Sequence, residues 1–281
     1  MKFAICQEMF VDWEWERQCR LIAEIGYTGI EVAPFTLASS ITDVSPEQRR
    51  TMRKQAEDQG LQIVGLHWLL AKTEGLHLTS ASAAVRQATA KHLIALGQAC
   101  ADFGGELMVF GSPLQRSLET GMTRAQADSH AAEVFGAVLP AFADRGVCIC
   151  LEPLSTQDTD FVNTCAEAME IIKTVDQPNF KLHQDVKAML VAETDDIPTL
   201  IERHAEHLGH FHVNDGNLLG PGMGATNFTP IFETLLKVNY QDWVSVEVFD
   251  YKPGAEKIAR DSMTYMQETL ARIRFDHKTE R

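Results

Sequence analysis

The chain has 281 residues, of which 45% are hydrophobic and 23% are charged, and its formal net charge is −14. These ordinary globular proportions exclude a disordered or fibrous protein, and an acidic chain without a basic cluster disfavours a nucleic-acid partner. The length suits a single large domain such as an α/β barrel, with enough residues to bury a core.

Short apolar runs alternate with longer segments of helical periodicity along the whole chain. The strand candidates, several of them rich in Val and Ile, are Phe3–Cys6, Gly29–Ala33, Gln62–His67, Leu107–Gly111, Val147–Glu152, Phe180–Asp185, Gly209–Asn214 and Trp243–Phe249. The helix candidates that follow them in turn are Trp15–Ile25, Pro46–Gln59, Ala83–Phe103, Arg124–Asp144, Ala166–Val175, Ile197–His207, Thr229–Lys237 and Glu256–Ile273. A glycine follows each of the first four helices, which is typical of a C-terminal cap.

Eight repeats of strand and helix predict a single (β/α)8 TIM barrel of the α/β class. The competing fold, a doubly wound open sheet, usually carries a glycine-rich turn after its first strand, and the segment Cys6–Met9 is not such a turn. No linker or repeat divides the chain, so we expect one domain over residues 1–281 that ends in a polar tail over residues 275–281.

The cysteines and the N-terminal segment predict a cytoplasmic protein. The six cysteines include no C-x-x-C pair, which is typical of a reduced compartment rather than of a disulfide scaffold. The N-terminal segment MKFAICQEMFVDWEWE lacks the apolar stretch of a signal peptide. No apolar run approaches the ~20 residues that span a membrane, so we expect no membrane partner.

Metal-binding residue types end the last four predicted strands. In TIM barrels the active site lies at the C-terminal ends of the strands, where this chain has Glu152, Asp185, His212 and Glu247. Neighbouring strands are about 4.8 Å apart, so their ends can converge on one ion. Carboxylates with one imidazole predict a divalent ion, Mn²⁺ first, with Mg²⁺, Co²⁺ or Zn²⁺ as alternatives. His183 and His210, each two residues before one of these ligands, are expected to pack in the core or to support the site.

Five further residues are candidates for substrate binding. His67 and Trp68 end the third predicted strand, where the imidazole can bind a substrate hydroxyl and the indole can form an aromatic wall. Glu31 lies inside the second predicted strand, where its burial requires a substrate contact or a basic partner. Arg116 and Lys187 lie in loops after strand ends and can bind a phosphate or a carboxylate.

The motifs at these strand ends resemble those of the xylose isomerase-like barrel superfamily. They are LEP at Leu151–Pro153, QD at Gln184–Asp185, GHFHVND at Gly209–Asp215 and SVEV at Ser245–Val248, with IGYTGIEV at Ile25–Val32. The superfamily includes ketose 3-epimerases, hydroxypyruvate isomerases, inosose isomerases and dehydratases, and endonuclease IV. By resemblance to the epimerase and isomerase branch, one divalent ion would be bound by Glu152, Asp185, His212 and Glu247. The two glutamates would act as acid and base.

The resemblance implies a divalent-metal-dependent isomerase or epimerase of a sugar or sugar-derived keto compound. Such an enzyme removes a proton next to a carbonyl through a metal-stabilised enediolate. Its partner would be a small sugar or sugar acid, and the sequence is compatible with a homo-oligomer. A dehydratase on the same scaffold is the first alternative, and a non-catalytic sugar-binding barrel is another.

Departures from two members narrow this expectation. Endonuclease IV uses further histidines, and this chain has Ala188, Gly222–Asn227 and Phe110–Ser112 in their place, so an endonuclease-IV-like hydrolase is the least favoured alternative. The tagatose and psicose type of epimerase also uses the histidine that Ala188 replaces, and an arginine where this chain has Leu218. The resemblance therefore extends to the shared metal core but not to that ketohexose subtype.

Overall fold

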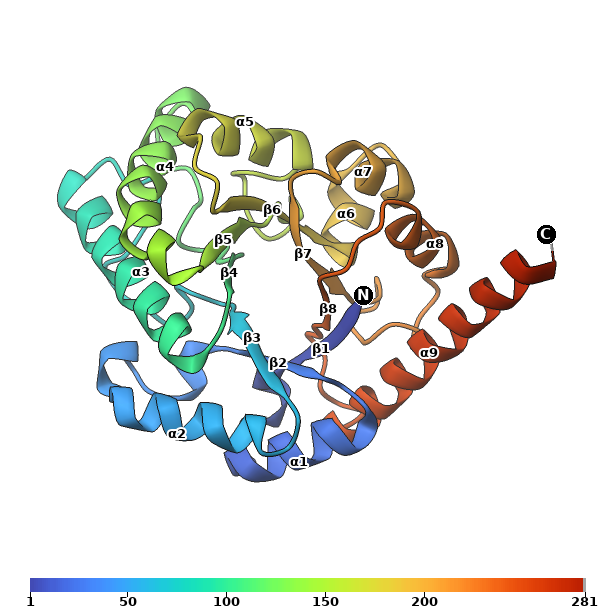
Figure 1. Cartoon of the computed structure of the whole chain (residues 1–281). Coiled ribbons are helices and arrows are strands. Elements are labelled where there is room, and N and C mark those ends of the chain that lie inside the picture. The colour runs from blue at the N-terminus through green and yellow to red at the C-terminus, as the bar shows by residue number, and fades with distance from the viewer. Residues whose placement is uncertain (280–281) are drawn as a thin grey trace.

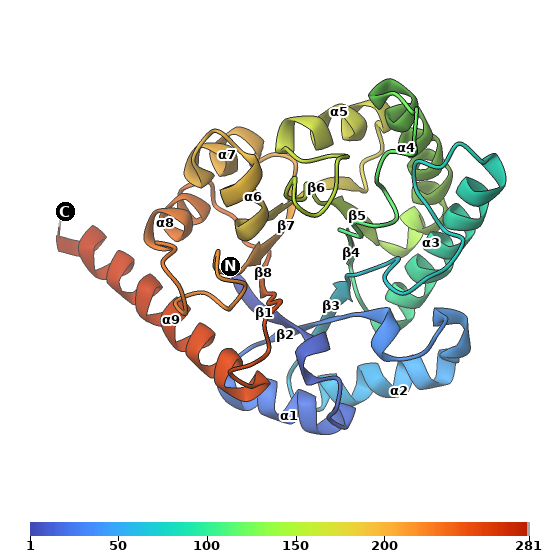
Figure 2. The same cartoon turned by 180° about the vertical axis from the view of Figure 1, so that it is seen from behind.

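Eight parallel strands close into a barrel in the computed structural model, which describes residues 1–279. They follow one another in chain order, and the first strand pairs with both the second and the last. The strands are β1 (Lys2–Cys6), β2 (Gly29–Val32), β3 (Gln62–Leu66), β4 (Leu107–Phe110), β5 (Cys148–Leu151), β6 (Phe180–Asp185), β7 (Leu208–Val213) and β8 (Trp243–Val246). The helices surround the strands (Figure 1), as the opposite side of the molecule also shows (Figure 2). The predicted (β/α)8 TIM barrel is confirmed.

The surrounding helices begin and end with the caps that the sequence provides. They are α1 (Trp15–Ile25), α2 (Pro46–Glu57), α3 (Ala83–Phe103), α4 (Arg124–Val138), α5 (Cys165–Val175), α6 (Val186–Ala192), α7 (Ile197–His204), α8 (Thr229–Lys237) and α9 (Ala255–Thr279). Capping boxes start α2, α4 and α5. Gly26 and Gly104 end α1 and α3 in the left-handed conformation, which costs little without a Cβ atom.

The structure departs from the predicted helices at three places. The predicted helix Arg124–Asp144 is an α-helix only to Val138 and continues as a 3-10 helix, because Pro140 has no N–H for an α-helical hydrogen bond. Helix α6 was not predicted, since its seven residues are too few to show a helical period. The predicted polar tail over residues 275–281 is helical as far as Thr279, because polarity marks exposure rather than a helix end, and residues 280–281 lie outside the described chain.

Side chains that point into the barrel form layers of different polarity. One layer is apolar and includes Ala4, Val64 and Trp243. A second layer, further along the strands, contains His183 and His210, which are register partners on β6 and β7. Asp185 and His212 form the next register pair, two residues nearer the C-terminal strand ends. The buried imidazoles of His183 and His210 therefore lie in the barrel layer next to the candidate metal ligands.

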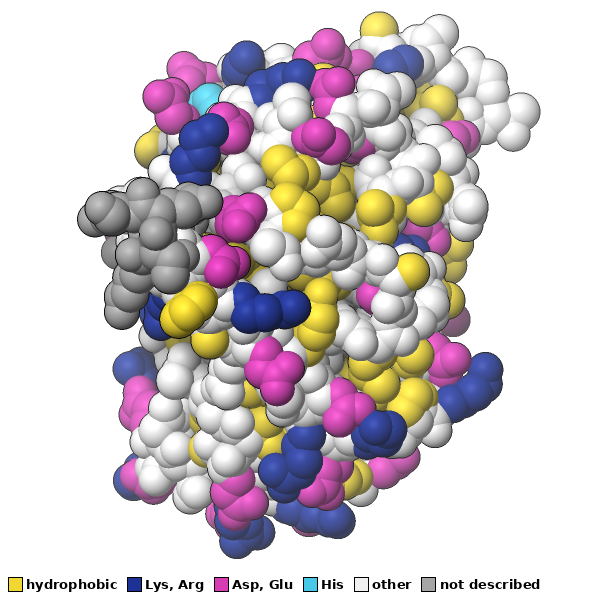
Figure 3. Space-filling model, turned by 90° about the vertical axis from the view of Figure 1, so that its right-hand side faces the viewer, with side chains coloured by type: hydrophobic (Ala, Val, Ile, Leu, Met, Phe, Trp, Pro, Cys, Tyr) yellow, Lys and Arg dark blue, Asp and Glu magenta, His cyan; other side chains and the backbone are white. Residues whose placement is uncertain are grey.

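The outer surface carries charges of both signs. On the face drawn in Figure 3, acidic and basic side chains are interspersed with hydrophobic ones. Such mixing of charges is typical of an ordinary solvated surface, whereas a surface that attracts a charged partner usually carries a patch of one sign. Within residues 1–279, none of the helices combines the length and the apolar composition that a bilayer crossing requires.

Candidate active site

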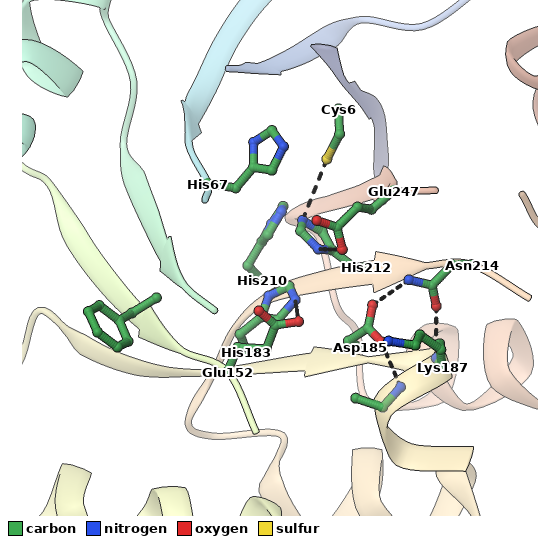
Figure 4. A network of polar contacts seen from close by, with 12 residues as sticks. Cys6, His67, Glu152, His183, Asp185, Lys187, His210, His212, Asn214 and Glu247 are labelled. Carbon is green, nitrogen blue, oxygen red and sulfur yellow. Dashed lines mark hydrogen bonds and ion pairs between the residues drawn. The ribbon is translucent and has the colours of Figure 1, made fainter. Parts of the chain in front are cut away.

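The residues predicted to bind metal lie together at the C-terminal strand ends. Glu152 follows β5, Asp185 ends β6, His212 lies near the end of β7 and Glu247 follows β8. Donor atoms of Glu152, Asp185 and His212 lie within 4.8 Å of one another, together with a nitrogen of His183. Glu247 adjoins them through His212, whose Nδ1 lies 3.1 Å from Glu247 Oε2 (Figure 4). We call Glu152, Asp185, His212 and Glu247 the carboxylate cluster.

Both carboxylate oxygens of Asp185 are held by hydrogen bonds. Oδ1 accepts the N–H of Ala188 at 2.7 Å and so caps α6. Oδ2 accepts the side-chain amide of Asn214, whose own carbonyl oxygen accepts the N–H of Lys187 at 2.8 Å (Figure 4). Burial and the neighbouring Glu247 raise the pKa of Asp185 to about 6. The carboxylate is thus oriented before any ligand binds, and a nearby cation would favour its ionised form.

His212 lies between two carboxylates. Its Nδ1 faces Glu247, and its Nε2 lies 3.2 Å from each carboxylate oxygen of Glu31. Burial lowers the pKa of His212, but the Glu31 and Glu247 charges outweigh it and raise that pKa well above its usual value. A carboxylate that holds the far nitrogen of an imidazole is typical of metal-binding histidines, because it fixes the orientation of the ring.

Glu31 lies beneath the carboxylate cluster rather than beside a substrate. Its fully buried carboxylate also lies 2.8 Å from Nε2 of His210, and it is absent from the wall of the pocket above the cluster. Of the two roles expected for Glu31, the structure shows the basic partner and no contact with the pocket, because the imidazoles of His210 and His212 occupy its carboxylate. They are the basic partners that its burial requires.

The donor set of the carboxylate cluster fits a divalent cation. Burial and repulsion from Glu247 and Asp185 raise the pKa of Glu152 well above its usual value. Both ring nitrogens of His183 are buried and have no hydrogen-bond partner within the described part of the chain, and Nε2 lies 3.8 Å from Glu152 Oε1. Crowded carboxylates beside an unpartnered imidazole suit Mn²⁺, Mg²⁺, Co²⁺ or Zn²⁺. His183, which the sequence places among the core or supporting residues, is therefore also a candidate ligand.

A cavity of about 90 Å³ adjoins Glu152, Asp185 and Glu247, and we call it the carboxylate pocket. Its walls include His67, Trp68, Lys187 and Phe249. Trp68 has a left-handed backbone with φ of 53°, a strain that bulky residues retain mainly at functional sites. Its ring meets Phe249 edge-on with the centroids 6.4 Å apart. Lys187 Nζ lies 3.0 Å from Asp158 Oδ2 and 4.6 Å from the centroid of Phe249. Three predicted substrate-binding residues thus reach this pocket.

Glu8, which is not among the predicted site residues, lies against His67. Glu8 lies in the short 3-10 helix Gln7–Phe10 that follows β1, and its Oε2 is 2.7 Å from Nε2 of His67, with both side chains buried. Nδ1 of His67 lies 3.9 Å from Oε1 of Glu31. The sequence did contain a signal for Glu8, because it is the first acidic residue after the first strand and active-site residues of TIM barrels lie at the C-terminal strand ends. This contact fixes the His67 ring in the pocket wall.

Arg116 is a structural residue and does not reach the carboxylate pocket. Its fully buried guanidinium donates hydrogen bonds to the backbone oxygens of Phe110, Glu152 and Ser112 at 2.6, 2.6 and 3.3 Å. The prediction that Arg116 binds a phosphate or carboxylate is wrong, because these carbonyl oxygens would otherwise be buried without donors. Arg116 therefore ties the end of β4 to the start of the loop that carries Glu152.

Replacing Arg116 by methionine is expected to lower the free energy of unfolding by about 3 kcal/mol or more, since an unsatisfied buried polar group costs about 1–3 kcal/mol. Urea titration followed by circular dichroism measures this change. Lys187→Met is the matched control, because Lys187 is partly exposed and its ion pair contributes at most about 1 kcal/mol. A fully stable Arg116→Met protein would show that the carbonyl contacts are dispensable.

Gly111, directly after β4, makes room for the Glu152 carboxylate. A Cβ atom at Gly111 would lie 1.7 Å from Oε2 of Glu152. We expect Gly111→Ala to lower turnover by about 100-fold, the scale for a misplacement of about 1 Å in an active site. The control is Gly136→Ala on α4, where no atom lies within 4 Å of the added Cβ. Turnover assays compare the two variants, and equal activity would mean that the position of Glu152 is unimportant.

The chain matches known proteins over most of its length. Residues 19–269 match the family model described as xylose isomerase-like TIM barrel. A ketose 3-epimerase of Arthrobacter globiformis is 26% identical over 159 residues, which are 57% of this chain and 53% of that protein. A 3-dehydro-D-guloside 4-epimerase of Escherichia coli is 30% identical over 128 residues, which are 44% of this chain and 47% of that protein. These matches span about half the length of each relative.

A solved structure agrees with the fold over nearly the whole chain. A D-psicose 3-epimerase crystallised in the presence of D-fructose has a TM-score of 0.83 and 24% sequence identity, covering 98% of this chain and 99% of that one. At this identity the agreement concerns the arrangement of the elements. It supports the closed barrel independently of the motifs at the strand ends.

Proposed function

We propose that this chain, which belongs to the xylose isomerase-like TIM barrel family, is a divalent-metal-dependent isomerase or epimerase of a sugar or sugar-derived keto compound. The observation that carries the proposal is the gathering of buried carboxylates and His212 at the C-terminal strand ends, next to a small pocket. Two relatives, each matched by this chain over about half of the relative's length, are named as sugar epimerases. Those names support the reaction class and leave the substrate of this chain open.

The ion would be held by the carboxylate cluster, with His183 as a further donor. When bound, a divalent ion stabilises the negative charge that develops on a substrate carbonyl oxygen. The hydrogen bonds to Asp185 from Ala188 and Asn214 orient one donor, and Glu31 orients the His212 ring. The chain thus supplies donors that are already in position, which lowers the cost of ordering them on binding.

Glu152 and Glu247 would move the proton. Both carboxylates line the carboxylate pocket, one from the end of β5 and the other from the end of β8. A carboxylate within hydrogen-bond reach of a C–H next to a carbonyl acts as general base. If the second glutamate returns a proton to the other face, the carbon is inverted. If one glutamate returns the proton to the neighbouring carbon, an aldose and a ketose interconvert.

The pocket walls would position the remaining substrate atoms. His67, held by Glu8, presents an imidazole edge, and Trp68 and Phe249 present aromatic surface. Lys187 adds a cation at the pocket wall that can bind a substrate oxygen, because among the described residues its ammonium forms an ion pair with Asp158 alone. Together they orient the carbonyl and the adjacent C–H toward the glutamates, and such orientation supplies much of catalysis.

The proposal also includes Mn²⁺ as the metal and the cytoplasm as the compartment. Oxygen donors with one or two imidazoles suit Mn²⁺ without excluding Mg²⁺, Co²⁺ or Zn²⁺. The six cysteines are free thiols, which supports a reduced compartment. Metal analysis of protein purified without added salts, followed by reloading with each ion, would identify the preferred metal.

A substrate panel with and without a chelator tests the proposed function. Protein loaded with Mn²⁺ is incubated with D-fructose, L-ribulose, hydroxypyruvate and a 3-keto-glucoside, and the products are followed by NMR. We expect an epimer or isomer of at least one compound, and EDTA should abolish its formation. Loss of water from the substrate would identify a dehydratase instead. Turnover that is unaffected by EDTA would contradict the metal dependence.

A further inference from the structure

A second and larger cavity opens beside the carboxylate pocket. Its volume is about 470 Å³, against about 90 Å³ for the carboxylate pocket. The two cavities share Trp68 and Pro113 in their walls. Pockets for drug-sized molecules measure about 300–1,000 Å³, so the smaller cavity accommodates the reacting atoms and the larger one has room for a substituent. We call the larger cavity the apolar chamber.

Apolar side chains form most of the wall of the apolar chamber. They are Val11, Phe35, Trp68, Ala71, Pro113, Leu114 and Tyr251. Leu114 is 76% exposed and Val11 is 50% exposed, and apolar side chains that gather at a surface commonly mark a binding site. The chain of a free ketose carries a hydroxyl on nearly every carbon, and these groups would lose hydrogen bonds to water in such a chamber. The wall therefore favours an apolar occupant.

Four polar residues interrupt this apolar wall, namely Glu8, Lys72, Ser112 and Gln115, and Glu8 is the only carboxylate among them. Glu8 lines the chamber and is 5% exposed. Its Oε2 contacts His67, whereas its Oε1 is buried and has no hydrogen-bond partner among the described residues. A buried acceptor without a donor is costly, so a ligand hydroxyl at Oε1 would be favoured. A mostly apolar wall with a few polar groups suits a ligand that is mostly apolar and carries a hydroxyl near its junction with the reacting part.

We propose that the apolar chamber binds the aglycone of a glycoside, so that the substrate is a keto-glycoside. Its reacting carbons would lie in the carboxylate pocket, and an aryl or alkyl aglycone would pack between Trp68, Leu114 and Tyr251. A ring hydroxyl near the glycosidic bond would donate to Oε1 of Glu8. This inference rests on the proposed function for its chemistry, whereas binding in the chamber requires no turnover.

Glycosides that lack a carbonyl test the chamber separately from the reaction. Phenyl and methyl glucopyranosides of both anomers are titrated calorimetrically into Mn²⁺-loaded protein. We expect one phenyl glycoside to bind at least about tenfold more tightly than its methyl counterpart, because burial of an aromatic ring is worth more than that factor. Leu114→Ser should remove most of this preference. Leu236→Ser, which changes an exposed leucine on α8 outside the chamber, should retain it.

Equal affinity for phenyl and methyl glycosides would overturn the proposal, as would a phenyl preference that persists in Leu114→Ser. A second copy of the chain over the chamber would also overturn it, and light scattering would then show a smaller assembly for Leu114→Ser. If free ketoses are converted but no phenyl preference exists, the proposed function stands and the chamber proposal falls. If the preference exists but neither a keto-glycoside nor a free ketose is converted, binding in the chamber stands and the proposed function falls.

Discussion

Replacing either Glu152 or Glu247 by glutamine is expected to lower kcat by about 10²–10⁴-fold, the usual contribution of a general acid or base. Glutamine keeps the size of the side chain and one oxygen donor but cannot accept the substrate proton. Each variant should therefore retain part of its metal while turnover is lost. Metal content by mass spectrometry and kcat at saturating Mn²⁺ separate these two effects. Glu24→Gln on α1, where the side chain is exposed, is the matched control.

Isotope exchange then distinguishes the two proton-transfer schemes. If two glutamates work on opposite faces, exchange of the substrate C–H with solvent should survive in one variant and disappear in the other. If one glutamate shuttles the proton, a single variant should lose both exchange and product. Near-normal turnover in both variants with metal bound would show that neither glutamate is the base, and His67 would be the next residue to replace.

Loss of a residue that hydrogen-bonds a metal ligand typically weakens metal binding by about 10- to 100-fold. Asp185→Asn is expected to weaken metal binding by more than that, because it removes a charged ligand. Asparagine is also a good N-cap, so α6 and the fold should be preserved. Asn214→Ala, which removes the amide that holds Asp185, should fall within the 10- to 100-fold range itself. Competition with a fluorescent chelator measures both affinities.

Asp196→Asn provides the control for this experiment. Asp196 caps α7 through the N–H of Thr199 at 2.8 Å, as Asp185 caps α6. It does not line the carboxylate pocket, so metal affinity should be unchanged in that variant. If Asp185→Asn binds metal as tightly as Asp196→Asn does, the ion is held elsewhere.

The site residues at the strand ends could be predicted because, in a TIM barrel, the position of a residue along its strand determines where it lies in the fold. A residue at the C-terminal end of a barrel strand, or just after it, lies at the mouth of a TIM barrel, and Glu152, Asp185, His212 and Glu247 all satisfy that rule. His67 and Trp68 reach the carboxylate pocket for the same reason. The alternation of strands and helices could also be predicted, because hydrophobic residues recur at different spacings in buried strands and in amphipathic helices.

Interactions between distant residues could not be predicted in this way. Arg116 looked like a free loop cation, and only the folded chain shows that it curls back to three carbonyl oxygens. The contact of Glu8 with His67 joins residues that follow β1 and β3, and it depends on the paths of the chain after both strands. Glu31 could have met a substrate or a basic partner, and the positions of His210 and His212 decide the outcome.

The incorporation of solvent deuterium tests the central claim most directly. The Mn²⁺-loaded protein is incubated in D₂O with the converted substrate, and proton NMR follows the C–H next to the carbonyl. We predict deuterium at that carbon in the wild type, its absence after chelation, and a loss of at least 100-fold in the exchange rate in the Glu→Gln variant whose glutamate removes the proton. Exchange that continues after the metal is removed, or that is unchanged in both Glu→Gln variants, would contradict metal-dependent proton transfer by these glutamates.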